Sequence, residues 1–161
     1  MTDTPSPHRA RPATQADEDT LVEGNLAMAL ETEGLALDPT ILRAGVRRAL
    51  GGDVGAAYFL VDHPHTGTPL GQLMVTREWS DWRNREVWWI QSVYVWPEAR
   101  KTGVYAALYR KVCHDARAAG AGGVRLYVDT RNTRAQAVYT RLGMNGEHYR
   151  VFEAMFSATT D

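Results

Sequence analysis

Apolar residues recur at helical spacing in four stretches of the chain, and polar capping residues precede the first two. Thr14 is followed by Asp17 three positions later, and Asp38 comes directly before Pro39; both arrangements are typical of helix starts. Glycines stand at the ends of these stretches, where helices commonly stop. The pattern predicts helices over residues 14–33, 38–50, 103–119 and 132–142.

Between these stretches the pattern changes to short runs rich in aromatic and β-branched residues, which favour strands. Strands are predicted at residues 9–11, 57–61, 70–76, 86–95, 124–128 and 149–156. The strand–helix–strand order over 86–128 implies a parallel, right-handed crossover, whereas the earlier strands read as antiparallel. The predicted fold class is α/β (mixed α+β), with a mostly antiparallel sheet of six to seven strands, a central parallel pair and helices on both faces.

Composition limits the kind of protein. The 161 residues suffice for one domain, expected over 9–156 between polar tails at 1–8 and 157–161. A formal net charge of -1 argues against a general nucleic-acid or membrane binder. The single cysteine, Cys113, excludes a cysteine-based zinc site and suits a reducing cytoplasm. No metal, nucleic-acid or membrane partner is therefore expected.

One segment carries a chemical signal. The strand 86–95 leads into a polar loop, and a helix begins at Gly103. A helix N-terminus presents unpaired N–H groups and the positive end of the helix dipole, and Arg100 and Lys101 add positive charge there. These features predict a site for an anion or pyrophosphate. The alternative is an ordinary strand-to-helix turn with solvated charges.

The same segment resembles the acyl-CoA loop of the GCN5-related N-acetyltransferase (GNAT) superfamily. The pattern of that loop is Arg or Gln, two residues, Gly, one residue, then Gly or Ala. Arg100 and Gly103 match it, whereas Tyr105 stands where the family usually has a small residue. Residues 132–144 resemble a second family motif, a helix with Asn, Ala, Tyr and Gly at fixed spacing. The element order agrees over residues 9–156, so the resemblance implies the GNAT fold with a splayed central parallel pair.

The resemblance also implies acetyl-CoA as cosubstrate and assigns residues to it. In this family the backbone of the strand before the loop pairs with the pantetheine arm, and the loop amides hold the pyrophosphate. The cofactor-binding residues implied are Val93, Tyr94, Val95, Arg100, Lys101, Thr102, Gly103, Val104, Tyr105, Asn132 and Tyr139. Tyr139 matches the family tyrosine that acts as general acid on the leaving thiolate. Its alternative role is to complete the apolar stripe of its helix.

Several groups are alternatives for the base that deprotonates the attacking amine. Family members often carry a carboxylate or histidine at the positions of Trp89 and Gln91, and neither residue can act as a base. Gln91 is therefore expected to orient a water molecule in the catalytic site, and the alternative is an amine that arrives already neutral. Glu31 and Glu33 end the first helix, which borders the acceptor site in this family. Asp81 and Glu86 are the other carboxylates that the pattern places near the site. For each of these four carboxylates, the alternative is a solvated surface charge.

All five tryptophans fall between residues 79 and 96, a crowding that core packing does not require. Residues 79–85 are predicted to form the turn between two strands. Trp79, Trp82 and Trp89, with acids nearby, are expected to offer an aromatic wall to a cationic amine. A dimer interface or plain core packing are the alternatives.

The resemblance implies an N-acetyltransferase that uses acetyl-CoA to acetylate a primary amine of a small molecule or peptide. The expected reaction is direct attack in a ternary complex. The alternative is a non-catalytic sensor that only binds acyl-CoA. A scaffold with a dead cofactor site is a third possibility, against which the basic loop residues Arg100 and Lys101 count. The family's frequent dimers make a homodimer an expectation as well.

Overall fold

The computed structural model describes residues 7–157, and the chain divides into two compact units, one ending at Leu126 and one beginning at Tyr127. The first unit holds a sheet and three α-helices, and the second holds one helix followed by irregular chain. Most of the predicted tails, 1–8 and 157–161, lies outside the described residues. The tails and the single domain over 9–156 remain predictions.

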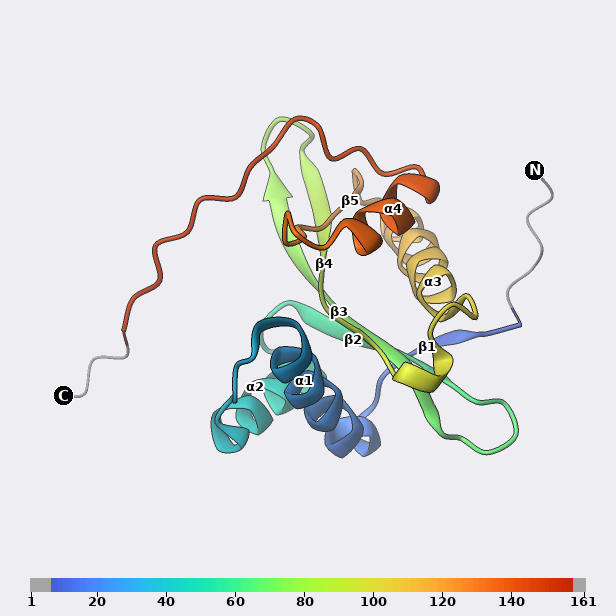
Figure 1. Ribbon diagram of the computed structural model, residues 1–161. Coiled ribbons are helices and arrows are strands. Elements are labelled where there is room, and N and C mark those ends of the chain that lie inside the picture. Colours follow the sequence, from blue (N-terminus) through green and yellow to red (C-terminus); the bar gives the residue numbers. More distant parts are fainter. Residues whose placement is uncertain (1–6, 158–161) are drawn as a thin grey trace. The chain divides into compact units, whose positions relative to one another are not determined.

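The sheet of the first unit has five strands in the order β1-β2-β3-β4-β5 (Figure 1). The strands are β1 (Ala10–Pro12), β2 (Ala56–Asp62), β3 (Pro69–Ser80), β4 (Arg85–Val95) and β5 (Val124–Arg125). The first four are antiparallel to their neighbours, and β5 runs parallel to β4. The predicted mixed, mostly antiparallel sheet with one parallel pair is confirmed.

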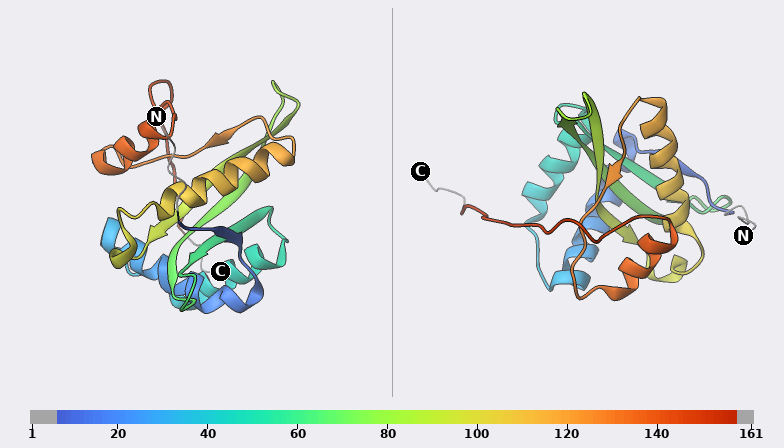
Figure 2. Two further views of the ribbon diagram at one scale, coloured as in Figure 1. Left: turned by 90° about the vertical axis from the view of Figure 1, so that its right-hand side faces the viewer. Right: turned by 90° about the horizontal axis from the view of Figure 1, so that it is seen from above.

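Helices cover both faces of this sheet, as predicted. On one face lie α1 (Glu18–Glu33) and α2 (Pro39–Gly51), and on the other lies α3 (Val104–Ala118) (Figure 2). Leu21 and Val46 pack with Leu60 on the first face, whereas Leu108 packs with Val75 on the second. All five of these side chains are at most 1% exposed, so each face has its own apolar core.

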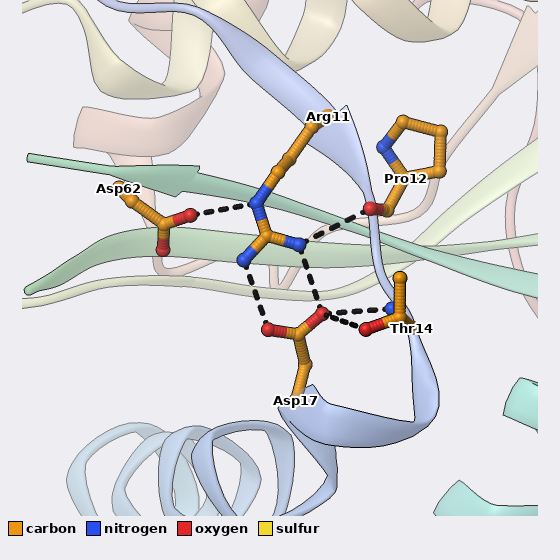
Figure 3. Close-up of polar contacts among 5 residues, drawn as sticks. All are labelled: Arg11, Pro12, Thr14, Asp17 and Asp62. Atoms are coloured by element: carbon orange, nitrogen blue, oxygen red, sulfur yellow. Dashed lines mark hydrogen bonds and ion pairs between the residues drawn. The ribbon is translucent and has the colours of Figure 1, made fainter. Parts of the chain in front are cut away.

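Arg11 ties the first strand to the start of α1 (Figure 3). Its Nη1 and Nη2 donate to the Asp17 carboxylate at 2.8 and 2.9 Å, and its Nε donates to Asp62 Oδ2 at 2.7 Å. Asp17 ends the short 3-10 helix η1 (Gln15–Asp17) and also accepts from the Thr14 amide at 2.7 Å. The helix start predicted from Thr14 and Asp17 is therefore confirmed.

The pairing of β3 with β4 contains an irregularity. Met74 faces Gln91, but Gln72 faces Tyr94, so β4 has one more residue than β3 between these two pairs. Ser92 adopts a φ of +51° within this stretch. A bulge of this kind bends the strand and reverses the alternation of side chains beyond it.

The second unit differs from the sequence-based prediction. Its helix α4 (Thr133–Arg141) begins as expected at Asn132, whose Oδ1 accepts from the Ala135 amide at 3.0 Å. The strand predicted at 149–156 is wrong, because these residues form no regular structure. Phe152 and Phe156 are 93% and 94% exposed. Aromatic and β-branched residues show that a segment suits a strand, but they do not supply the neighbouring backbone that a strand must pair with.

The strand count falls because the segment 149–156 is irregular. The strand predicted at 124–128 does form, as β5, but it covers only two residues. The part of the chain that the structure describes therefore has five strands, not six or seven. Among the helices in residues 7–157, none combines the length and hydropathy that a bilayer-crossing segment needs.

Candidate functional site

The central feature of the site is an unpaired strand edge. The parallel ladder joins only Trp88 to Val124 and Trp89 to Arg125. β4 continues from there to Val95, and within the described residues no strand pairs with this part of its β5 side. An open strand edge presents N–H and C=O groups that an extended ligand can use as an added strand. The edge includes Val93, Tyr94 and Val95, the residues expected to meet the pantetheine arm.

A tight loop follows this edge and leads into α3. It contains the short 3-10 helix η2 (Pro97–Ala99), and both Lys101 and Gly103 have left-handed φ values, +65° and +91°. Thr102 Oγ1 closes the loop by donating to the Ala99 carbonyl at 2.6 Å. The first amides of α3 point out of the helix start without intrahelical acceptors, and the dipole favours an anion there. The loop thus fits a pyrophosphate.

Arg100 lies in this loop, but its side chain is already engaged. Nη1 and Nη2 bind the two carboxylate oxygens of Glu31 at 2.7 and 2.8 Å, and Nε donates to the Val95 carbonyl at 3.0 Å. The Arg100 guanidinium lowers the pKa of Glu31, and the Glu31 carboxylate raises the pKa of Arg100. Glu31, expected at the acceptor site, therefore pairs with the loop, and Lys101 and the helix terminus remain as the positive groups.

Tyr105 replaces the usual small residue without filling the loop. Its ring stacks on Tyr109 at 6.3 Å between centroids, and both rings pack against the core that α3 forms with the sheet. Burial raises the pKa of Tyr109 to about 12. The side chain at position 105 is thus accommodated on the inner side of α3.

Gln91 and Trp89 project toward the face covered by α1 and α2. Their β3 partners, Met74 and Thr76, are two positions apart and so lie on one face. Met74 packs with the α1–α2 core, which identifies that face. Gln91 Nε2 donates to Thr76 Oγ1 at 2.5 Å, which leaves the Gln91 Oε1 as the acceptor on this side chain. Trp89 Nε1 donates to Glu78 Oε2 at 2.6 Å.

Glu78 is a carboxylate on this face that the sequence reasoning missed. It lies two positions from Thr76 on β3 and therefore on the same side. Arg125 Nη1 lies 3.3 Å from its Oε1. Alternation along β3 is the signal that could have located Glu78, but only once the register with β4 is known.

The three tryptophans do not form one wall. Trp79 belongs to β3, not to the turn, and projects to the face opposite Trp89. Trp82 stands in the turn and is 89% exposed. Asp81 accepts from the Trp82 amide at 2.9 Å, and Glu86 lies 3.8 Å from Arg77 on the α3 side. Of these three tryptophans, Trp89 alone shares a face with Gln91.

The remaining predicted residues are placed as follows. Glu33 is the exposed last residue of α1. Asn132 and Tyr139 belong to the second unit, where Asn132 uses its side chain to cap α4 and burial raises the pKa of the Tyr139 phenol. In residues 7–157, no group of three or more His, Cys, Asp or Glu side chains is arranged to hold a metal ion.

Comparisons with known proteins bear on the fold and the family. The sequence matches the acetyltransferase (GNAT) family over residues 30–144, a range that contains both the loop and α4. A search among curated proteins finds no match. Among solved structures, a possible acetyltransferase from Clostridium difficile 630 is 34% identical with a TM-score of 0.83, and the match covers 93% of this chain and 98% of that one.

Two more distant structures share the fold. A predicted acetyltransferase with acetyl-CoA from Clostridium acetobutylicum is 14% identical with a TM-score of 0.71, covering 91% of this chain and 96% of that one. Glucosamine-6-phosphate N-acetyltransferase from Arabidopsis thaliana is 13% identical with a TM-score of 0.70, covering 92% and 99%. The family match over residues 30–144 and the 34% identical relative together show that this chain belongs to the GNAT family of acetyltransferases.

Proposed function

We propose that the protein is an N-acetyltransferase that moves the acetyl group of acetyl-CoA to a primary amine of a small molecule or peptide. The observation that carries the proposal is the open β4 edge, which ends at a loop with left-handed Lys101 and Gly103 and the start of α3. An extended ligand with a phosphorylated end fits this order of features.

The residues fit acetyl-CoA part by part. The amides of a pantetheine arm match the backbone groups of Val93–Val95 that face away from β3, where the Val95 carbonyl also accepts from Arg100 Nε. The amides of residues 101–105 suit the pyrophosphate. Lys101 supplies a positive charge beside them. When bound, acetyl-CoA supplies an activated acetyl thioester, so the protein itself needs to position the amine and move protons.

Direct transfer forms one C–N bond and breaks one C–S bond. The amine gives up a proton, and the departing thiolate takes one up. We propose that the Tyr139 phenol donates the proton that the thiolate takes up, since its raised pKa keeps the phenol protonated at neutral pH. We propose that the proton lost by the amine passes to a water held by Gln91 Oε1, because Gln91 Nε2 already donates to Thr76. Cys113 is 8% exposed within α3 and has no place in this scheme.

Thermal unfolding with acetyl-CoA and with free CoA tests the proposal. A ligand at about 100 times its Kd stabilises by roughly 2.7 kcal/mol, which raises the Tm of a chain of this length by about 5 to 10 °C. Thiol release is then followed with a panel of amines. The absence of a Tm shift with either ligand would overturn the proposal, and a shift without turnover on any amine would favour the acyl-CoA sensor.

The proposal extends to partners and compartment. The net charge of -1 favours a small-molecule or peptide acceptor over nucleic acid or membrane. We propose that the protein works in the reducing cytoplasm, without a metal, and as a homodimer. Sedimentation equilibrium of the full chain tests the last point, and a monomer at micromolar concentration would contradict it.

A further inference from the structure

Glu31 and Arg100 belong to different elements, and their side chains join these elements at one point. Glu31 lies in the last turn of α1, and Arg100 directly follows η2 within the loop. The guanidinium of Arg100 holds both oxygens of Glu31 at 2.7 and 2.8 Å and the Val95 carbonyl at 3.0 Å. One cation therefore connects α1, the loop and the end of β4.

Tyr94 supports this connection from the sheet. Its ring centre lies 5.7 Å from Arg100 Cζ, and its hydroxyl lies 3.5 Å from Glu31 Oε2. Tyr94 is only 7% exposed, so it offers a fixed surface to the ion pair. A two-point Arg–carboxylate pair against such a surface restricts the orientation of both side chains more than a single contact does.

The contact with Val95 gives the pair a consequence for ligand binding. Val95 is the last residue of the open β4 edge, and the loop that follows begins from it. Because Arg100 Nε binds its carbonyl, the orientation of that peptide group depends on where Glu31 holds the guanidinium. Glu31 thus influences the edge and the loop through Arg100.

We propose that Glu31 is a positioning residue that acts through Arg100 to hold the β4 edge and the loop in the shape that binds acetyl-CoA, and that it is not a ligand of the acceptor amine. The inference rests on the proposed function of the same site. It assigns Glu31 to the cofactor half of the reaction, in place of the acceptor half expected from the sequence.

The test is the Kd of free CoA, measured by calorimetry without any amine, so that it depends on neither turnover nor the acceptor. Glu31→Gln and Arg100→Gln should each weaken CoA binding by about 3- to 10-fold. The double variant should bind no more weakly than the weaker single variant, because both changes remove one connection. Glu23→Gln is the matched control: it removes the same charge from an exposed site on α1 and should leave the Kd unchanged.

Three results would overturn the proposal. An unchanged CoA Kd in Glu31→Gln, with a raised KM for the amine, would show that Glu31 binds the acceptor. Additive losses in the double variant would show that Glu31 and Arg100 act independently. A wild-type protein that does not bind CoA would overturn the proposed function itself, which distinguishes that failure from the other two.

A folding defect is separated from positioning by a second variant. Arg100→Lys keeps the charge but loses the two-pronged geometry and the Nε donor to Val95. It should weaken CoA binding as much as Arg100→Gln while keeping the Tm of the wild type. With a saturating amine, Arg100→Lys should show a raised KM for acetyl-CoA and an unchanged kcat. Wild-type CoA affinity in Arg100→Lys would contradict it.

Discussion

Gln91 and Tyr94 lie three residues apart on β4 and yet project from the same face of the sheet. Gln91 is opposite Met74, which packs with the α1–α2 core, and Tyr94 is opposite Gln72, whose Nε2 donates to the α1 backbone at 3.2 Å. Strict alternation would separate them. The extra residue at Ser92 shifts the alternation of side chains by one position. Gln91 and Tyr94 therefore both project to the side that α1 covers.

Replacing Ser92 tests how much the bulge depends on its left-handed backbone. A β-branched residue at positive φ is strained, so Ser92→Val should lower the free energy of unfolding by about 1–2 kcal/mol. Ser92→Gly adopts the same φ without that strain and should be close to the wild type. Urea unfolding of both variants measures the difference. Equal stability of the two variants would show that this backbone conformation is not fixed by the bulge.

Changing Gln91 to Glu tests the absence of a carboxylate base. In the wild type, kcat/KM for an amine should rise with pH until the amine itself is deprotonated, because no side chain at positions 89 or 91 can take the proton. Gln91→Glu places a carboxylate where the Oε1 of Gln91 stands. Its kcat/KM should therefore fall less steeply as the pH is lowered from about 9 to 6.

The control for this comparison is Gln91→Ala, which removes the amide without adding a base. It should lower kcat/KM at every pH and keep the slope of the wild type. Parallel pH profiles for all three proteins would mean that proton removal does not pass through position 91.

Local signals were sufficient for most of the first unit. The cap at Thr14 and Asp17 and the start at Asp38 and Pro39 depend on residues within one helical turn of each other, and the structure has both. The loop before Gly103 likewise lies between a strand end and a helix start that are separated by eight residues. Such features are readable from the sequence because the atoms that make them are neighbours in the chain.

Features that depend on strand register were not readable. Glu78 and Trp79 are adjacent in sequence and project to opposite faces. Only the pairing with β4 shows which of them lies on the same face as Trp89. The bulge at Ser92 reverses faces once more within β4. The ion pair between Glu31 and Arg100 joins residues 69 positions apart, and no local pattern encodes it.

Removing the hydroxyl of Tyr139 tests its role as proton donor. Tyr139→Phe keeps the ring but cannot donate a proton to the thiolate, so kcat should fall by about 10- to 1000-fold. The Kd of acetyl-CoA should change by no more than about twofold, because the lost group acts on the leaving atom. Single-turnover thiol release and calorimetry measure the two quantities. An undiminished kcat would assign Tyr139 to packing alone.

The pKa of Asp17 predicts a pH-dependent part of the stability. Hydrogen bonds from Arg11 are the largest cause that lowers this pKa from 3.8 to about 2 in the folded protein. The unfolded chain therefore binds more protons than the folded one between these values, and stability rises with pH in that window. The contribution is complete above about pH 5 and is lost as the pH falls toward 2. Solvent around the pair reduces it to about 1 kcal/mol.

Asp17→Asn removes this contribution while keeping the shape of the side chain. In urea unfolding at about pH 7 the variant should be less stable than the wild type by about 1 kcal/mol, and the difference should shrink as the pH is lowered through 4 to 3. Asp19→Asn is the control, since that carboxylate is 89% exposed and its ion pair with Arg43 lies on the surface. Surface pairs contribute little, so its stability should follow the wild type at each pH. A constant difference between Asp17→Asn and the wild type across this range would show that Asp17 stabilises the fold without the ionised pair to Arg11.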